Sequence, residues 1–523
     1  MQNNLTQILN KVKYPAVIAF MLFGLVFSKW ILSASQFVLL AVVLSDSASR
    51  KKLVAAFRSP IVLSLISIYI FYLSGLLWTT DLKYGLKDIQ NKIPMLAFPV
   101  LFYAIGPFKK KVADFLLMIF ILFVTALSAI SIINFYISVQ VPEQIAIGQS
   151  HIRFSLLICF SVLLLVHYGN KKEKWFKLCF IPVIAVLLFF LFILESFTGY
   201  VVILFLSVIL PVLYKQRIKK KIFFSVIAAV LIIISALAFW GVYDVKNNCF
   251  PHIERVKYSS LDTSTINGNK YHHDTAAMLA ENGNQVYLYV QEKEMIDAWN
   301  NRSTKKITDS SQFNPQTNIL MRYLSSKNLR KDSVGVYSLS NQDIKNIEQG
   351  ISNYKLSDFD PYRKRIYRFL WELNYYKVSG DPSGHSLTQR FEYWKAAINI
   401  IKNHPWIGVG TGDINVSFKN EYNFMNSKLK PEYRLRSHNQ YLSVTVALGV
   451  AGLIIFIFTL LAPFVLYKIP DKKLYFGYIF IFLLSMLNED TLETQVGVTF
   501  YALFNSFLLF ILPSLKQIEN EKE

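Results

Sequence analysis

The residues best suited to chemistry lie in the run Arg434–Leu442 (RLRSHNQYL), directly before a long apolar segment. If this segment is helical, His438, Tyr441 and Thr445 share one face. An imidazole exchanges a proton near neutral pH, which is the property that a general base needs. His438 is therefore a candidate base, and a helix-capping or interfacial histidine is the alternative.

Two further arginines lie where an apolar surface begins. Arg153 follows His151 and Ile152 at the start of an apolar run, where a cation is costly unless it reaches the interface or pairs with an anion. Arg390 lies at the edge of an apolar helical stripe. A guanidinium in such a place suits bidentate phosphate binding. The alternatives are snorkelling to lipid headgroups for Arg153 and an ion pair with a neighbouring carboxylate for Arg390.

The elements that must position these residues are membrane helices. The 523 residues are 53% hydrophobic and 15% aromatic, the mean hydropathy is +0.35, and apolar runs long enough to cross a bilayer recur along the chain. We therefore expect an all-α polytopic membrane protein with about twelve transmembrane helices. The predicted spans are residues 14–29, 31–45, 60–79, 91–107, 112–138, 152–168, 178–195, 198–214, 222–242, 439–467, 474–488 and 495–513.

Charge alternation predicts the orientation of these spans. Every even-numbered connection is basic, as in Arg50-Lys51-Lys52 and Lys109-Lys110-Lys111, whereas the odd-numbered short connections, such as Asn488-Glu489-Asp490, are not. The positive-inside bias places both termini in the cytoplasm and residues 243–437 outside. The net charge of +21 is thereby explained by topology. The basic residues show no aromatic-interleaved groove pattern, so we expect no nucleic-acid partner.

The large outer loop is expected to be folded. Val286–Val290 alternates like a short strand, while later segments are helical in pattern, so we expect a small mixed α/β insertion at about 250–380. An amphipathic helix is predicted at about 386–403, along the membrane surface. The predicted domains are 1–242, an N-terminal membrane bundle of about nine helices; 243–437, the periplasmic loop; and 438–523, the C-terminal membrane helices and a short cytoplasmic tail.

Other motifs carry less weight. The run from Gly408 to Asp413 (GVGTGD) is similar to a dinucleotide loop, but it follows a helix and Pro405, so a turn is expected. His272-His273-Asp274 has a poor chelating geometry, and Cys249 has no partner within its loop. We expect no metal, no cofactor and no disulfide within the loop.

Four runs in the same order resemble the O-antigen ligase/polymerase superfamily. They are Arg390–Ala397 (RFEYWKAA), His404–Gly412 (HPWIGVGTG), Ser437–Leu442 (SHNQYL) and Gly449–Gly452 (GVAG). The tail run Asn488–Glu493 (NEDTLE) is also similar to members of this group. Residues 250–350 have no counterpart in the family's core pattern.

The resemblance implies a GT-C-like glycosyltransferase of the bacterial inner membrane, working in lipopolysaccharide and cell-envelope polysaccharide synthesis. Its donor would be an undecaprenyl-diphosphate-linked glycan, and its acceptor lipid A–core or another glycan, without nucleotide or metal. The site residues that we expect are His438 as base with Glu195 as the alternative base; Arg153, Arg390 and Arg436 for the diphosphate; and His151, Tyr441 and Trp394 in support. Where family members often carry Ser-Arg, this chain reads Glu195-Ser-Phe-Thr-Gly199, so Arg153 or Arg436 must replace that arginine.

Three functions stay open at this level. A ligase and a polymerase would both present diphosphate-binding arginines and a base. A transporter of lipid-linked glycan would place ionisable residues or broken helices near the midplane, but the central parts of the clearest predicted spans carry no charge. A receptor whose loop only binds partners would leave the grouping of Arg153, Arg390 and His438 unexplained.

Overall fold

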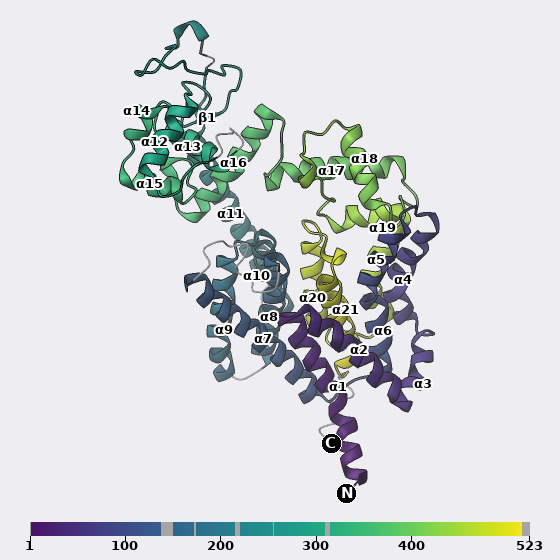
Figure 1. Cartoon of the computed structure of the whole chain (residues 1–523). Coiled ribbons are helices and arrows are strands. Elements are labelled where there is room, and N and C mark those ends of the chain that lie inside the picture. The colour runs from purple at the N-terminus through teal and green to yellow at the C-terminus, as the bar shows by residue number, and fades with distance from the viewer. Residues whose placement is uncertain are drawn as a thin grey trace. The chain divides into compact units, whose positions relative to one another are not determined.

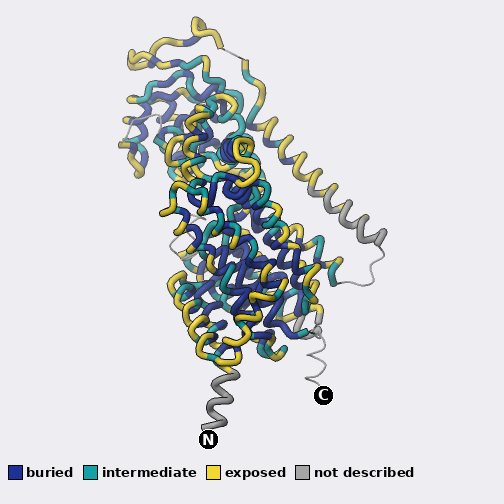
Figure 2. The backbone as a smooth tube through the Cα atoms, turned by 90° about the vertical axis from the view of Figure 1, so that its right-hand side faces the viewer, coloured by how far each residue is buried: buried dark blue, intermediate teal, exposed yellow. Residues whose placement is uncertain are grey.

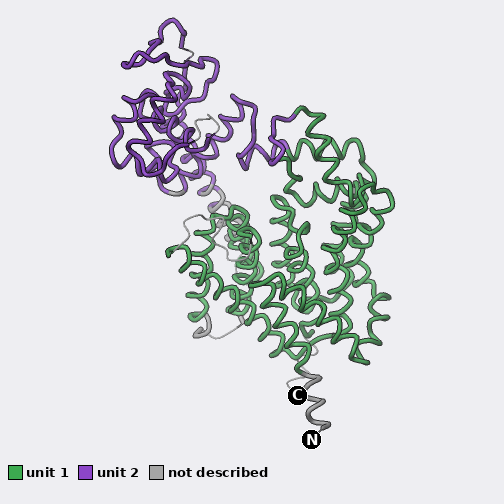
Figure 3. Tube along the Cα trace, viewed as in Figure 1, with its two compact units in different colours: residues 1–223, 393–426, 434–523 green, residues 224–392, 427–433 purple. Residues whose placement is uncertain are grey.

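The computed structural model of the protein describes residues 2–137, 150–171, 174–214, 220–254, 256–308 and 314–514. Residue 138 of the fifth predicted span, and residues 255 and 309–313 of the predicted insertion, lie outside these ranges. The chain forms two compact units, which are coloured separately in Figure 3. Unit 1 comprises residues 1–223, 393–426 and 434–523, and unit 2 comprises residues 224–392 and 427–433.

Unit 1 is a bundle of apolar helices (Figure 1). Each of the twelve predicted spans coincides with helical residues. The N-terminal helices are α1 (Gln2–Phe27), α2 (Lys29–Ser45), α3 (Ser47–Ala56), α4 (Pro60–Ser74), the 3-10 turn η1 (Gly75–Trp78), α5 (Leu82–Lys92), α6 (Pro94–Ile105), α7 (Lys110–Ile137), α8 (His151–Lys171), α9 (Lys174–Ile193), α10 (Phe197–Tyr214) and the start of α11 (Lys220–Cys249). The C-terminal helices are α19 (Gln440–Leu466), α20 (Lys472–Ser485), the 3-10 turn η6 (Thr491–Glu493), α21 (Gln495–Ser506) and the π turn η7 (Phe507–Ile511).

Not every one of these helices can span a membrane alone. Within the described part of the chain, five helices are long and apolar enough, or six if α2 and α3, bent by 102°, form one broken span. The fourth predicted span is shorter than expected because Pro94 starts α6 and Gly106, at φ 79°, ends it. Its 12 residues rise only about 18 Å. The protein is thus an all-α multi-pass membrane protein, and the number twelve stays a prediction.

Helix α8 lies at the core of the bundle. Its residues from Phe154 to Leu165 are almost all buried, as the dark interior of unit 1 in Figure 2 reflects. The ring of Phe160 packs against Phe120, Tyr478 and Phe504 with centroids 4.7–5.7 Å apart. A helix that is apolar on all sides must be covered by neighbouring helices or by lipid, and here helices cover α8 from Phe154 to Leu165. Elements from both ends of the sequence therefore fix the position of the first turn of α8, which carries Arg153.

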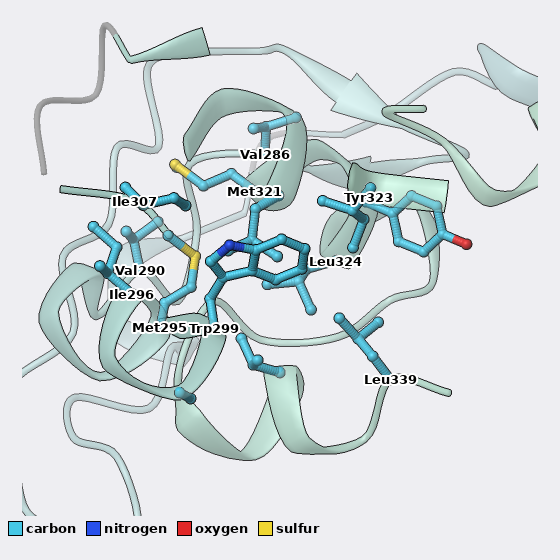
Figure 4. Packing of buried hydrophobic residues seen from close by; sticks show 14 of the residues in the cluster. Val286, Val290, Met295, Ile296, Trp299, Ile307, Met321, Tyr323, Leu324 and Leu339 are labelled. Carbon is cyan, nitrogen blue, oxygen red and sulfur yellow. The ribbon is translucent and has the colours of Figure 1, made fainter. Parts of the chain in front are cut away.

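Unit 2 contains the predicted insertion, and it has its own hydrophobic core. Figure 4 shows the buried Trp299 indole among Met295, Met321 and Leu324, and Trp299 Nε1 donates to the carbonyl oxygen of Lys305 at 2.9 Å. The insertion's elements are β1 (Ala280–Glu281), β2 (Asn284–Gln285), α12 (Glu292–Arg302), α13 (Pro315–Ser326), α14 (Ser333–Tyr337), α15 (Asn341–Glu348) and α16 (Pro361–Ser379).

The prediction of a mixed α/β insertion is wrong. Its described residues form helices and only two strands, of two residues each. Val286, Leu288 and Val290 are alternately buried, which explains the sequence pattern. Their segment hydrogen-bonds to three separate parts of the chain, near Leu279, His272 and Lys331, so no strand ladder forms.

The final part of the predicted outer loop belongs to unit 1. Helix α17 (Ser386–Asn403) covers the segment for which an amphipathic helix is predicted. From residue 393 onward this helix belongs to unit 1. Helix α18 (Ile414–Phe424) also lies in unit 1, where Asn399 Nδ2 donates to Glu421 Oε1 at 2.8 Å. Most of the sequence that carries the family-like runs thus folds with the membrane bundle.

Candidate functional site

The start of α19 is hydrogen-bonded to the turn between α20 and α21. Asn439 caps α19 by accepting a hydrogen bond from the Leu442 amide at 3.1 Å. The buried Gln440 side chain accepts from the Leu492 amide at 2.7 Å and donates to Glu493 at 3.0 Å. Residues 437–440 and 486–493 therefore form one structured end of the bundle.

His438 is held at this end in an unusual backbone conformation. Its φ is 47°, in the left-handed region, which costs free energy for a residue with a side chain and is held only by firm surroundings. The surroundings include Trp394 Nε1, which donates to the Ser437 carbonyl oxygen at 3.0 Å, and the ring of Tyr393, 5.5 Å from the imidazole centroid. His438 Nδ1 lies 3.9 Å from Glu489 Oε2, and its side chain is 36% exposed, so a substrate can reach it.

Arg153 lies within electrostatic range of the same carboxylate. It lies in the first turn of α8, and it interacts electrostatically with Glu489. The charge of Glu489 therefore acts on Arg153, and its carboxylate lies 3.9 Å from His438 Nδ1, although the two residues are far apart in sequence. His151, the predicted supporting residue, begins α8 and is half-buried.

Glu195 lies in the turn between α9 and α10 and also has a left-handed backbone, with φ 48°. The next residue, Ser196, donates to Ser155 Oγ on α8 at 3.0 Å. Asn488 Nδ2 donates to Thr198 Oγ1 at 3.0 Å. The turn that carries Glu195 thus contacts α8, and the first turn of α10, directly after it, contacts Asn488. Both candidate bases therefore lie at the same end of the bundle.

A buried network of charges lies beneath this end. Lys92 Nζ is 2.8 Å from both carboxylate oxygens of Asp88 and 2.9 Å from Glu493 Oε2, and Lys92 is fully buried. Arg436 Nη1 lies 3.0 Å from the same Glu493 oxygen. Burial by itself would raise the pKa of Glu493, but Lys92 and Arg436 outweigh it, and with Gln440 they lower this pKa to about 2. Glu493 is consequently an anion that links α5, η6 and the segment before α19.

Asp490 is a second acidic residue of this turn. Its Oδ1 accepts from Ser443 Oγ at 2.8 Å and from Ser437 Oγ at 3.5 Å. Burial, and then the nearby Glu493 carboxylate, raise the pKa of Asp490 despite the bond from Ser443. Asp490 fixes the backbone on either side of His438 through these two hydroxyls.

The remaining predicted residues have other contacts. Arg436 donates from Nε to Asn415 Oδ1 at 2.8 Å in addition to its ion pair with Glu493. Tyr441 donates from its hydroxyl to the Leu483 carbonyl oxygen at 3.0 Å, on the side of α19 that faces α20. Arg390 belongs to unit 2, where it interacts electrostatically with Glu372, which is the kind of carboxylate that the ion-pair alternative requires.

Sequence reasoning missed the acidic partners. Glu489, Asp490 and Glu493 lie in the NEDTLE run, which the resemblance had marked without giving its residues a role. Asp88 and Lys92 have the spacing of an ion pair along one helix face. Their position directly before an apolar run was the available signal for a buried pair.

The glycine-rich run 408–413 is a packed turn, as expected. The Val409 and Gly410 amides each donate at 2.9 Å to carbonyl oxygens of α19, and Asp413 accepts from the backbone amides of Thr80 and Asp81 at 2.7–3.1 Å. Pro405 accepts from the Val450 amide at 2.8 Å, beyond the point where α19 is broken. The turn therefore fixes the course of α19, whose first residues hold the site.

Replacing Gly449 with alanine should destabilise the protein. Gly449 breaks α19 with φ 66° and ψ −168°, a conformation that is almost restricted to glycine and costs another residue about 1–3 kcal/mol. A Cβ there would also lie 2.2 Å from the Trp406 carbonyl group. We expect a lower melting temperature for Gly449→Ala in detergent, whereas Gly169→Ala in α8, with the nearest atom at 3.7 Å, should not lower it. Equal melting temperatures for Gly449→Ala and the wild type would contradict this account of the break.

Comparison with known proteins agrees with the resemblance found in the sequence. The family model for O-antigen ligase matches residues 338–457. This range includes His438, the glycine-rich turn and the break in α19, but not the partners Lys92, Glu489 and Glu493. A search of curated proteins finds no match. Residues 338–457 thus match the O-antigen ligase family, which supports the resemblance of the chain to the O-antigen ligase/polymerase superfamily.

Proposed function

We propose that the protein is a metal-independent glycosyltransferase of the O-antigen ligase type. It transfers a glycan from an undecaprenyl-diphosphate carrier to an acceptor hydroxyl, either on lipid A–core or on another glycan. The reaction takes place at the periplasmic face of the bacterial inner membrane. The observation that carries the proposal is that Glu489 acts electrostatically on Arg153 and lies 3.9 Å from His438, at one end of an apolar bundle.

In the proposed reaction, the acceptor oxygen forms a bond with the anomeric carbon while the bond from that carbon to the diphosphate oxygen breaks. The leaving undecaprenyl diphosphate carries the developing negative charge. Arg153 lies in the first turn of a predicted membrane span, and we assign it the diphosphate because a fixed guanidinium stabilises such charge in a site of low dielectric. Arg390 and Arg436 are proposed as further diphosphate contacts on the strength of the family resemblance.

The acceptor hydroxyl must lose its proton as the new bond forms. His438 is the proposed base, because its imidazole is accessible and close to Arg153 through Glu489. The Glu489 carboxylate stabilises the imidazolium that results. Glu195 is the alternative base, since its turn contacts α8 and the start of α10 that follows it contacts Asn488.

The buried charges hold the backbone around His438 in place. Glu493 binds Lys92, Arg436 and Gln440, two of which lie within two residues of His438. A site must hold its groups to within a fraction of an ångström to be effective. We therefore assign Glu493 and Lys92 a positioning role.

Deleting the gene and examining surface glycans on a gel tests the proposal. For a ligase we expect loss of all long chains from lipid A–core together with accumulation of lipid-linked polymer. A product with a single repeat would identify a polymerase of the same superfamily. Unchanged surface glycans would contradict both forms of the proposal.

A further inference from the structure

Helix α16 lies across the last turns of α11 within unit 2. The Tyr362 hydroxyl donates to the Leu237 carbonyl oxygen at 2.9 Å, and the Arg363 guanidinium stacks 4.9 Å from the Trp240 ring centroid. Gly241 allows the close approach, because a Cβ there would lie 2.6 Å from Ile366 Cδ1. The start of α16 is therefore at the level of residues 237–241 of α11.

This level coincides with the edge of a predicted membrane span. Residues 222–242 of α11 are expected to cross the bilayer, so Leu237 lies about 7.5 Å along the helix from the end of that span. Trp240, Tyr243 and Tyr362 are 49%, 60% and 44% exposed. Tryptophan and tyrosine are enriched where lipid headgroups meet the hydrocarbon. The junction of α11 and α16 thus has the composition of a membrane interface.

The surface of α16 is strongly basic. Its basic residues are Arg363, Lys364, Arg365, Arg368 and Lys377, against the single acidic residue Glu372. Arg363 is paired with Asp244 and Asp360, each at 3.4 Å. Arg365 and Arg368 are exposed beside Phe369, whose side chain is 48% exposed. Glu372 interacts electrostatically with both arginines, but it is partly buried and accepts from the Leu387 amide at 2.9 Å.

We propose that Arg365 and Arg368 bind the phosphate groups of anionic phospholipids in the leaflet that α11 enters, while Phe369 and the Trp240–Tyr243–Tyr362 aromatics sit among the headgroups. Two observations support an anionic lipid as the partner. The surface of α16 is basic, and the α16–α11 contacts hold the start of α16 at the level of the predicted membrane edge. Unit 2 would then be anchored to the bilayer beside its own membrane helix. This lipid contact is separate from the proposed glycosyl transfer.

The test uses the full chain in lipid nanodiscs. Two kinds of phosphatidylcholine disc would be compared, one with brominated phosphatidylglycerol and one with brominated phosphatidylcholine at the same mole fraction. Bromine quenches tryptophan fluorescence at short range. Subtracting the spectrum of Trp240→Phe, which keeps a ring for Arg363, isolates the signal of Trp240. The arginine variant is Arg365→Gln/Arg368→Gln, and the matched control is Lys270→Gln/Lys345→Gln, which removes two exposed charges elsewhere in unit 2.

We expect brominated phosphatidylglycerol to quench wild-type Trp240 more strongly than brominated phosphatidylcholine does. The preference should fall roughly fivefold for each arginine removed and persist in the control. Equal quenching by the two lipids in the wild type, or an unchanged preference in the arginine variant, would overturn the proposal. So would a Trp240 signal that neither lipid quenches, or a control that loses the preference to the same extent.

Discussion

Replacing His438 with asparagine should lower glycan transfer by about 10²–10⁴-fold, the usual contribution of a general base. The choice of residue matters because His438 has φ 47°, and asparagine tolerates the left-handed region better than most residues do. The variant therefore removes the imidazole while it keeps the backbone. Transfer of labelled glycan to the acceptor in isolated membranes, at equal protein level, measures the effect.

Two matched variants make this result specific. His272→Asn removes an exposed histidine of the insertion and should leave the rate unchanged. Glu195→Asn removes the alternative base at a position with φ 48°. If Glu195→Asn loses activity and His438→Asn keeps it, the assignment of the base is reversed. Full activity in both variants would remove both residues from the proposed chemistry.

Replacing Lys92 with methionine should cost about 3–5 kcal/mol of unfolding free energy, because it leaves a buried charge without its partner. Lys92 is fully buried between Asp88 and Glu493. In its absence Asp88 loses this ion pair, and Glu493 retains its ion pair with Arg436. We expect a marked fall in the melting temperature measured by size-exclusion chromatography of heated samples. Transfer activity should fall as well, because Glu493 no longer holds α5 against the segment that carries His438.

The same helix provides the control for this variant. Lys87 is exposed on α5, and Lys87→Met should change stability by no more than about 0.5 kcal/mol. Adding Asp88→Asn to Lys92→Met removes one of the two carboxylates and should restore part of the lost stability. If Lys92→Met has the same melting temperature as Lys87→Met, the buried network does not stabilise the fold.

Much of the bundle could be predicted from the sequence, because apolar length is a strong local signal. Each predicted span lies on helical residues. The short α6 and the bend between α2 and α3 were harder to predict, since whether a broken apolar run crosses the membrane depends on its neighbours. The prediction of a short strand at Val286–Val290 was wrong, because alternating burial also occurs in a loop that packs over a core.

The candidate site could also be predicted only in part from the sequence. The chemistry of His438 and Arg153 can be predicted from residue type and position. In the structure His438 lies 3.9 Å from Glu489, and Glu489 acts electrostatically on Arg153. Lys92 could not be paired with Glu493 in this way, because 401 positions separate them and charge alone does not name the partner. The ion pairs beneath the site are a product of tertiary packing, which no local pattern specifies.

Reconstitution of the purified chain measures glycan transfer by this protein alone. The purified chain in nanodiscs would receive an undecaprenyl-diphosphate-linked glycan and an acceptor, and free undecaprenyl diphosphate would be quantified together with the glycosylated acceptor. We expect both products to appear in equal amounts with the wild type, and both to be lost with Arg153→Gln and with His438→Asn. Absence of either product with the wild type, or undiminished release with the two variants, would contradict the proposed glycosyl transfer.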